Sequence, residues 1–293
     1  MNKAKFSYTS IRSLPDWLKT SLPKGVNYFR LKKMVDKHGL NTVCETASCP
    51  NVGNCWSAGT LTLMILGSTC TRSCNFCDVP TGSMQVPRLE EPAEVAEMLA
   101  KLNLQYVVIT SVDRDDLHDG GAGIWAKTIQ HVRDKNPYLK IEALIPDFKG
   151  DEILINKICQ ANPDVICHNI ETVASLQSIV RPQCRYSWSL KVLKMVSQKN
   201  IISKSSLMLG LGEKKNEVVE TMRHLAEIKC QILSIGQYMR PSKNHLEVVE
   251  YIHPEVFAEY KTIGLSLGIK HVEAGPLVRS SYRADQQAQQ FFA

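Results

Sequence analysis

Three cysteines lie close together in the segment CTRSCNFC, residues 70–77. Cys70, Cys74 and Cys77 have the spacing C-x3-C-x2-C, and three neighbouring thiols cannot all pair in disulfides. A structural zinc ion takes four protein ligands, whereas thiolates are the usual ligands of an iron–sulfur cluster. Three thiolates on a four-iron cluster would leave one iron open to a substrate or cofactor. The ring of Phe76 could cover an aromatic ligand at that position. The spacing indicates such a cluster, and the alternative is a zinc knuckle with a distant fourth ligand.

A second set of three cysteines precedes the first, in the segment VCETASCPNVGNC. Cys44, Cys49 and Cys55 have the spacing C-x4-C-x5-C, and turn-forming residues between them allow the chain to fold back. Six of the ten cysteines therefore lie between positions 44 and 77. Clustering at short spacing in a chain with no recognisable secretory signal favours metal binding over structural disulfides. We expect a second metal site here.

Beyond residue 60 the sequence alternates between two kinds of segment. Apolar runs rich in strand-forming residues occur at 61–67, 106–110, 140–145, 164–170, 201–209 and 232–239. Stretches with helical periodicity separate them, and a further short strand is possible in IKHVEAG. Six β-then-α units predict a parallel sheet with right-handed crossovers. Six units are too few to close an eight-stranded barrel, so we predict an α/β fold with an open, partial (β/α)6 barrel of the TIM type.

This pattern predicts three parts of the chain. Residues 1–60 form an N-terminal extension that carries the second cysteine set, residues 61–274 form the barrel, and residues 275–293 form a C-terminal extension. The extensions do not fit the repeat, and we expect them to pack against the barrel.

Polar side chains follow several of the predicted strands. Parallel α/β sheets bind ligands at the C-terminal ends of their strands, and CTRSCNFC follows the first strand at such an end. A surface salt bridge is the alternative role for each arginine among the candidates. The candidates for cofactor binding at this end are Thr110, Ser111, Asp113, Asn169, Glu171, Arg181, Arg185, Gln237 and Tyr238. His168 is the histidine expected nearest to them, and the four remaining cysteines, Cys159, Cys167, Cys184 and Cys230, are expected to be packing thiols.

Composition and charge exclude several classes of protein. The formal net charge is +6, and the densest basic run, residues 29–37, is interrupted by Asp36, so charge does not support nucleic-acid binding. No run of eighteen apolar residues exists, so we expect no transmembrane helix and no membrane partner. The first residues lack the apolar region of a secretory signal, which favours a cytoplasmic protein.

The motifs resemble those of a known family. C-x3-C-x2-C at the end of a first barrel strand is typical of the radical S-adenosylmethionine enzymes, in which the open iron is chelated by the amino and carboxylate groups of S-adenosylmethionine. One-electron reduction then cleaves the cofactor to a 5′-deoxyadenosyl radical. The second cysteine set narrows the resemblance to the lipoyl synthase family. So do ITSVDRDDLHDGGA, HNIETV, GQYMRPSKNHL and AGPLVRSSYRAD, although Ser206 stands where the family usually has glycine.

The resemblance implies an activity and a set of cofactors. The family inserts two sulfur atoms at C6 and C8 of an octanoyl chain on a lysine of a carrier protein. Its cofactors are S-adenosylmethionine and two [4Fe–4S] clusters, of which the second is consumed as the sulfur donor. The fourth ligand of that second cluster is a serine of an R-S-x-Y motif. Ser280 is the direct match, and Ser281 is the alternative because adjacent residues point in different directions.

The resemblance also implies partners. These are octanoylated lipoyl carrier domains, either 2-oxoacid dehydrogenase acyltransferase subunits or the glycine cleavage H protein, and a low-potential electron donor such as ferredoxin or flavodoxin. Carrier domains of this kind tend to be acidic, so the basic residues around Lys32 and Lys33 are a candidate docking surface.

Two other functions remain possible from the sequence. A sulfur-inserting radical enzyme resembling biotin synthase would share the first cysteine set but not the second set or the R-S-x-Y tail. A noncatalytic iron–sulfur or zinc protein that binds nucleic acid would need a basic stripe or an exposed aromatic platform, and neither is visible in the sequence.

Overall fold

The computed structural model describes residues 14–20, 25–39, 41–47, 49–102 and 104–292. The prediction that the chain begins without a targeting segment falls mainly on residues 1–13, which lie outside the described residues. None of the helices in the described ranges combines the length and apolar character needed to cross a membrane.

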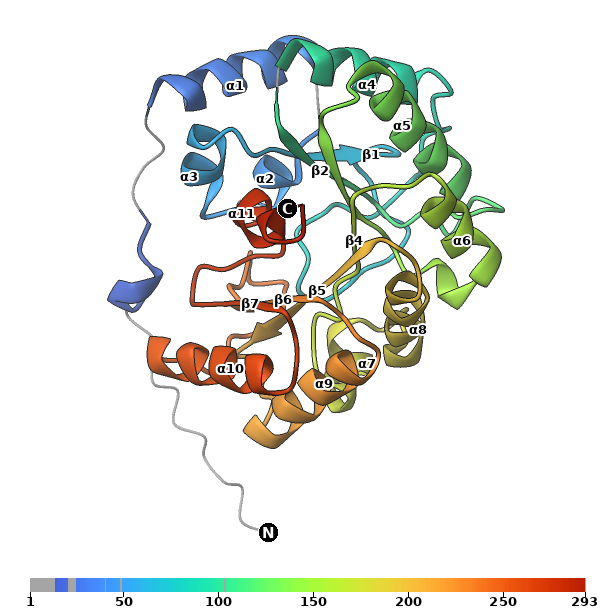
Figure 1. Cartoon of the computed structure of the whole chain (residues 1–293). Coiled ribbons are helices and arrows are strands. Elements are labelled where there is room, and N and C mark those ends of the chain that lie inside the picture. Colours follow the sequence, from blue (N-terminus) through green and yellow to red (C-terminus); the bar gives the residue numbers. More distant parts are fainter. Residues whose placement is uncertain (1–13, 21–24, 40, 48, 103, 293) are drawn as a thin grey trace.

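Seven parallel strands form one sheet in which the spatial order follows the chain order. The strands are β1 Thr62–Ile65, β2 Tyr106–Ser111, β3 Lys140–Leu144, β4 Val165–Cys167, β5 Ile202–Leu209, β6 Ile232–Gln237 and β7 His271–Ala274. The main helices between them are α4 Glu91–Leu102, α5 Ala122–Lys135, α6 Glu152–Gln160, α8 Tyr186–Ser197, α9 Lys215–Glu227 and α10 Pro254–Ser266. The sheet curves but does not close, so β1 and β7 are its edges (Figure 1). The predicted α/β partial barrel is confirmed, and the short run after α10 adds a seventh strand.

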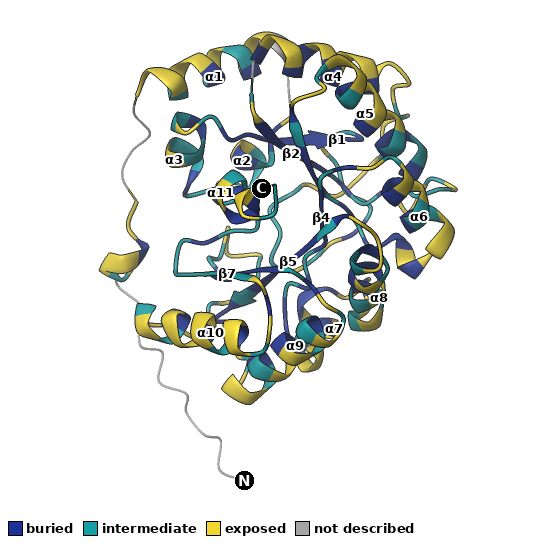
Figure 2. Cartoon of the chain, in the orientation of Figure 1, coloured by how far each residue is buried: buried dark blue, intermediate teal, exposed yellow. Residues whose placement is uncertain are grey.

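Alternate residues of a strand face the helices or the barrel interior. In β2, Val107 and Ile109 pack in the core beneath the helices, whereas Tyr106 and Val108 belong to a separate interior cluster. The helices have exposed outer faces, and the strands that they cover are largely buried (Figure 2). Burial of these apolar strand residues stabilises the barrel by roughly 25 cal/mol for each Å² removed from water.

The N-terminal extension lies beside the first edge strand. Helix α1 (Val26–His38) covers this end of the barrel, and the short helices α2 (Val43–Thr46) and α3 (Val52–Ser57) follow it (Figure 1). Thr42 forms an antiparallel bridge with Leu63 of β1, so the chain just before α2 is held at the strand edge.

The C-terminal extension enters the barrel interior. Ala284 and Ala288 of helix α11 (Ala284–Gln289) pack in the interior cluster with Val108 of β2. Ser234 Oγ of β6 donates a hydrogen bond of 3.0 Å to Gln287 Oε1. Helices α2, α3 and α11 therefore lie together on the open side of the barrel, between β1 and β7 (Figure 1).

Candidate functional site

The first cysteine set lies on the loop that follows β1. Cys70 N donates a hydrogen bond of 2.8 Å to Pro80 O, and Cys77 N donates one of 3.0 Å to Cys74 O, so the loop folds back on itself. The backbone amides of Arg72 and Asp113 lie 3.4 and 3.3 Å from Cys70 Sγ and donate to it. Such N–H groups orient a sulfur ligand and stabilise its thiolate form.

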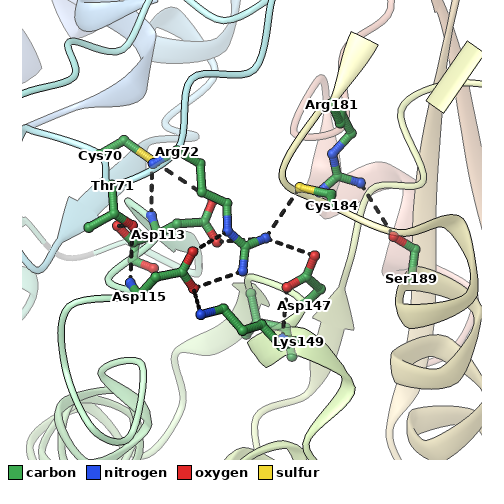
Figure 3. Close-up of polar contacts among 12 residues, drawn as sticks. Cys70, Thr71, Arg72, Asp113, Asp115, Asp147, Lys149, Arg181, Cys184 and Ser189 are labelled. Carbon is green, nitrogen blue, oxygen red and sulfur yellow. Dashed lines mark hydrogen bonds and ion pairs between the residues drawn. The ribbon is translucent and has the colours of Figure 1, made fainter. Parts of the chain in front are cut away.

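Arg72 ties this loop to the ends of two further strands (Figure 3). Its buried guanidinium donates to Asp115, with Nε 2.7 Å from Oδ2, and to Asp147, with Nη1 2.8 Å from Oδ2. Nη1 also lies 3.5 Å from Asp113 Oδ1 and 3.2 Å from Cys184 Sγ. Burial acts to raise the pKa of Asp147, but the hydrogen bonds and charge of Arg72 outweigh it and hold that pKa below its usual value. The loop position therefore depends on one buried cation.

The thiols of the first cysteine set are half-buried and have raised pKa values. Burial, together with the charges of Asp113 and Cys77, raises the pKa of Cys70 to about 11. Burial also raises the pKa of Cys77, to which Glu171 and Asp113 add. Neutral thiols of this kind become thiolates when cations bind, because the positive charge offsets both burial and repulsion.

Asn169, Glu171 and Arg181 are brought together near this loop. Asn169 Nδ2 donates a hydrogen bond of 3.0 Å to Glu171 Oε1, and Arg181 Nη1 lies 3.2 Å from Asn169 O. Glu171 has a φ of 67°, a left-handed conformation that is strained for a glutamate and common at binding sites. Arg181 is buried, and its Nε has no hydrogen-bond partner in the described part of the chain. A buried guanidinium N–H left over beside a carboxylate fits a zwitterionic ligand such as the methionyl group of S-adenosylmethionine.

Three other candidates have different surroundings. Thr110 Oγ1 donates to Leu144 O of the next strand at 3.0 Å. Ser111 Oγ accepts a hydrogen bond of 3.0 Å from Trp125 Nε1 of α5, so it faces the helix layer. Arg185 is exposed and stacks on a tryptophan ring. The structure brings none of these three into the group formed by Asn169, Glu171 and Arg181.

The last two candidates, Gln237 and Tyr238, hold a loop in place. Gln237 Nε2 donates to three backbone carbonyls, those of Leu209, Tyr238 and Glu250, and its Oε1 accepts from Ile252 N. Tyr238 Oη donates to Leu246 O at 2.8 Å, and its ring packs in a small apolar cluster that includes Phe76. Gln237 thus has no free polar group for a ligand, whereas Tyr238 supports the aromatic residue of the first cysteine loop.

Sequence reasoning did not identify Arg72, Asp147 and Cys184 as parts of this site. Cys184 was expected to be a packing thiol. Instead it accepts a hydrogen bond from Arg72, and a hydrogen bond with Cys74 lowers the pKa of Cys184. The available signal was the position of Arg72 inside the cysteine motif. His168 forms hydrogen bonds with Ile145 O and Ser189 Oγ, and its burial lowers its pKa to about 4, so it is a neutral support residue.

The second cysteine set surrounds a small pocket on the open side of the barrel. Cys49 N donates to Cys44 O at 3.0 Å, which closes the turn after α2, and Cys55 lies on α3. Burial and the charge of Cys49 raise the pKa of Cys44, and the same two causes raise that of Cys55 to about 12. The three thiols therefore interact electrostatically. The pocket is lined by Cys44, Cys49, Asn51, Val52, Cys55, Thr60, Thr62, Arg279, Ser281 and Tyr282.

The pocket wall contains Ser281 and not Ser280, which is opposite to the preference drawn from the motif. Adjacent side chains leave the backbone in different directions, which explains why only one of the two serines lines this pocket. Within the described ranges, no group of three or more His, Cys, Asp or Glu side chains is arranged as a site for a metal ion. In a cluster each thiolate binds a different iron, so the donor set of three thiols and a hydroxyl fits a cluster without meeting at one point.

Comparisons with known proteins identify the family. Residues 64–225 match the model of the Radical SAM superfamily, and residues 2–49 match the N-terminal domain of lipoyl synthase of the Radical SAM family. Lipoyl synthase of Flavobacterium johnsoniae is 51% identical over 273 residues, which cover 93% of this chain and 95% of the relative. Lipoyl synthase of Treponema denticola is 50% identical over 93% of this chain and 94% of its own. The mitochondrial lipoyl synthase of Nematostella vectensis is 49% identical over the same share of this chain and 94% of its own.

Solved structures of low sequence identity share the fold. Streptococcus suis SuiB bound to S-adenosylmethionine aligns with a TM-score of 0.59 at 11% identity, over 86% of this chain and 56% of that one. Methylornithine synthase (PylB) aligns with a TM-score of 0.52 at 12% identity, over 72% of this chain and 70% of that one. The superfamily match contains the first cysteine set, and it supports S-adenosylmethionine and an iron–sulfur cluster as cofactors. The chain belongs to the lipoyl synthase family of the radical S-adenosylmethionine superfamily.

Proposed function

We propose that this chain inserts two sulfur atoms into a protein-bound octanoyl group, with a different cluster at each set of cysteines. The observation that carries this proposal is the pocket that unites Cys44, Cys49 and Cys55 with Ser281, apart from the first cysteine loop. A radical enzyme with only one cluster would not need a second group of three thiols beside a hydroxyl. The division into extensions 1–60 and 275–293 and a barrel 61–274 is part of the same proposal.

The chemistry explains the need for two sites. The C–H bonds at C6 and C8 of an octanoyl chain are not acidic, so general acid–base catalysis cannot activate them. When bound at the first cysteine set, S-adenosylmethionine and an iron–sulfur cluster would supply the radical chemistry that activates these bonds, and a second cluster held by Cys44, Cys49 and Cys55 would supply the sulfur. Electrons come from a low-potential donor such as ferredoxin or flavodoxin.

The residues around the first cysteine loop bind and orient the cofactor. Cys70, Cys74 and Cys77 would hold the cluster, and Arg72 fixes their loop. With S-adenosylmethionine bound, Arg181 would donate its unpartnered Nε–H to the methionyl carboxylate, and Glu171 would accept from the ammonium group. Asn169 holds the Glu171 carboxylate in position through its amide.

The remaining candidates act around this group. Asp113 orients Cys70 through its backbone amide, and Thr110, Gln237 and Tyr238 hold the strand ends and the neighbouring loop. Ser111 and Arg185 lie outside the group, on the helix side and at the surface. We therefore assign cofactor contact to Asn169, Glu171 and Arg181 before the others.

An anaerobic reaction with an octanoyl-lysine peptide, S-adenosylmethionine and a chemical reductant tests the proposed function. We expect a lipoyl product, identified by its mass, and two molecules of 5′-deoxyadenosine for each lipoyl group. Deoxyadenosine without any sulfur-containing product, from protein in which both clusters are present by iron and sulfide analysis, would contradict the proposal.

The serine pair gives a prediction about the second site. Ser281→Ala should lower lipoyl formation by at least about tenfold while deoxyadenosine continues to form, because the pocket loses its hydroxyl ligand. Ser280→Ala is the matched control and should be milder. Product and deoxyadenosine are quantified in the same reaction. A larger loss in Ser280→Ala would restore the assignment made from the motif.

The carrier surface gives another prediction. Lys32 is paired with Asp36 and Glu45, at 2.5 and 2.8 Å, so its charge is largely satisfied within the chain. Lys33 and Lys37 are exposed on the same helix, α1, and no ion pair of either is present in the described part of the chain. Lys33→Glu with Lys37→Glu should weaken binding of an octanoylated carrier domain about tenfold at low salt, and less at high salt.

Binding is measured by titration calorimetry at two ionic strengths. Lys157→Glu with Lys194→Glu is the control, because it makes the same charge change on the exposed sides of α6 and α8. An affinity that is unaffected by salt and by the α1 substitutions would show that the carrier domain does not bind at this surface.

A further inference from the structure

The C-terminal segment that precedes Ser281 is held by residues far from it in sequence. Gly236 lies in β6, where a Cβ atom would stand 2.0 Å from Val278 O and 3.4 Å from Arg279 Nη1. Backbone atoms of the segment therefore occupy the space of a side chain at position 236. No residue larger than glycine fits unless the segment moves, because a backbone carbonyl cannot rotate away as a side chain does.

A second contact holds the same segment from the side of the cysteines. Asn51 lies in the loop between Cys49 and Cys55 and is 1% exposed. Its Nδ2 donates a hydrogen bond of 2.5 Å to Leu277 O, across 226 positions of the sequence. The side-chain amide of one residue thus joins the second cysteine loop to the tail.

Three consecutive carbonyl groups of the segment have partners. Pro276 O accepts from Gln237 N at 3.3 Å, Leu277 O accepts from Asn51, and Val278 O accepts from Arg279 Nη1 at 2.7 Å. Backbone groups that are satisfied in this way define one position of the chain. The segment is consequently fixed just before the residues that enter the pocket wall.

Arg279 connects the position in which residues 276–278 are held, here called the seat, to the pocket of the second cysteine set. It lines the same pocket as Cys44, Cys49 and Cys55, and its Nη1 donates a hydrogen bond of 2.7 Å to Val278 O. Ser281 and Tyr282 line the same wall, and Tyr282 N donates to Arg279 O to close a turn. The directions of these side chains follow from where the backbone is held at Val278.

We propose that Gly236 and Asn51 are positioning residues that seat the C-terminal segment and thereby present Ser281 to the second cysteine set. This inference rests on the proposed function of the second site. It adds two requirements that the cysteine and serine motifs do not contain. These are a residue without a side chain at position 236 of β6 and the side-chain amide of Asn51 in the second cysteine loop.

The first test uses the protein without clusters and does not depend on activity. Gly236→Ala and Asn51→Ala should each increase the rate of trypsin cleavage after Arg279 by about tenfold, because the segment leaves its seat. Gly264→Ala is the control. It lies in α10, where an added Cβ would stand 2.8 Å from side-chain atoms of Met222 and Val272, so it crowds the core without touching the segment. Parental cleavage rates in both test variants would overturn the proposal.

The second test uses the loaded protein. In a background of Cys70→Ala, Cys74→Ala and Cys77→Ala only the second cluster remains, and its electron paramagnetic resonance signal after reduction is recorded. Gly236→Ala and Asn51→Ala should shift this signal in the same way as Ser281→Ala, whereas Gly264→Ala should leave it unchanged. In the parental background, they should lower the ratio of lipoyl product to deoxyadenosine about tenfold.

The two tests separate the possible failures. Faster cleavage after Arg279 with an unchanged signal in all three variants, Ser281→Ala included, would show that the seat exists and that the serine is not a ligand. A shifted signal in Ser281→Ala with unchanged signals in Gly236→Ala and Asn51→Ala would overturn the positioning role. If Gly236→Ala does not fold, Asn51→Ala decides the outcome alone, since it removes one hydrogen bond and adds no atoms.

Discussion

Replacement of Cys44, Cys49 or Cys55 by alanine is expected to abolish sulfur insertion while S-adenosylmethionine cleavage continues. The three thiols line one pocket with Ser281, and the first cysteine loop is anchored separately by Arg72. Loss of a direct ligand should cost more than loss of the residues that support ligands, so we expect product to fall more than about a hundredfold. Deoxyadenosine and lipoyl product are measured in the same anaerobic reaction.

A labelled-sulfide experiment decides whether this site is the sulfur donor. The protein is loaded with isotopically labelled sulfide, excess sulfide is removed, and the product is weighed by mass spectrometry. Labelled product is expected in the first turnover. Unlabelled product from a fully labelled second cluster would contradict the assignment of this cluster as the sulfur donor. Efficient sulfur insertion by Cys44→Ala would contradict it as well. Cys159→Ala is the control and should behave like the parent, because this buried thiol of α6 does not line the pocket of the second cysteine set.

Alanine at Cys70, Cys74 or Cys77 is expected to abolish S-adenosylmethionine cleavage itself. Each of these cysteines lies on the loop that Arg72 and the amide of Asp113 hold at the ends of the strands. Without one thiolate the cluster loses a ligand, and both deoxyadenosine and lipoyl product should fall more than about a hundredfold.

The measurement is deoxyadenosine formed under excess reductant, with iron and sulfide analysis of each variant. The second site should keep its iron, so about half of the parental iron should remain, since each cluster holds four. Cys230→Ala is the matched control, because this thiol is buried at 2% exposure and forms hydrogen bonds with the backbone oxygens of Ser203 and Ile232, away from both cysteine sets. Deoxyadenosine at the parental rate in Cys74→Ala would refute the assignment.

Most of the fold was predictable because the periodicity of apolar residues over short stretches of sequence indicates strands and helices. Alternation of apolar runs and helical stretches predicted the parallel partial barrel, and the strand ends predicted where polar residues gather. The seventh strand, His271–Ala274, was less certain because four residues carry little periodic signal. Its position follows from pairing with β6, in which Ile232 lies opposite His271.

Several site residues could not be ranked from the sequence. Gln237 follows a strand, as a ligand-binding residue would, but Glu250 and Ile252 from a later loop use its amide. Thr110 and Ser111 are neighbours of similar polarity, and the pleat sends one toward a neighbouring strand and the other toward Trp125. Contacts of this kind depend on residues distant in the chain, which local pattern does not contain.

The sequence by itself determined that this protein has two sets of metal-binding thiols, because thiol spacing within a short loop limits what the loop can bind. The spacings C-x3-C-x2-C and C-x4-C-x5-C each place three thiols within one short segment, so their proximity does not depend on residues elsewhere in the chain. Only the tertiary structure decided how the second set is completed. Ser281 lines the same pocket as Cys49, and the chain just before it is held by close contact with Gly236 of β6 and by a hydrogen bond from Asn51 to Leu277 O. The direction of a single side chain depends on where its backbone is held, and here that is set across more than two hundred residues of the chain.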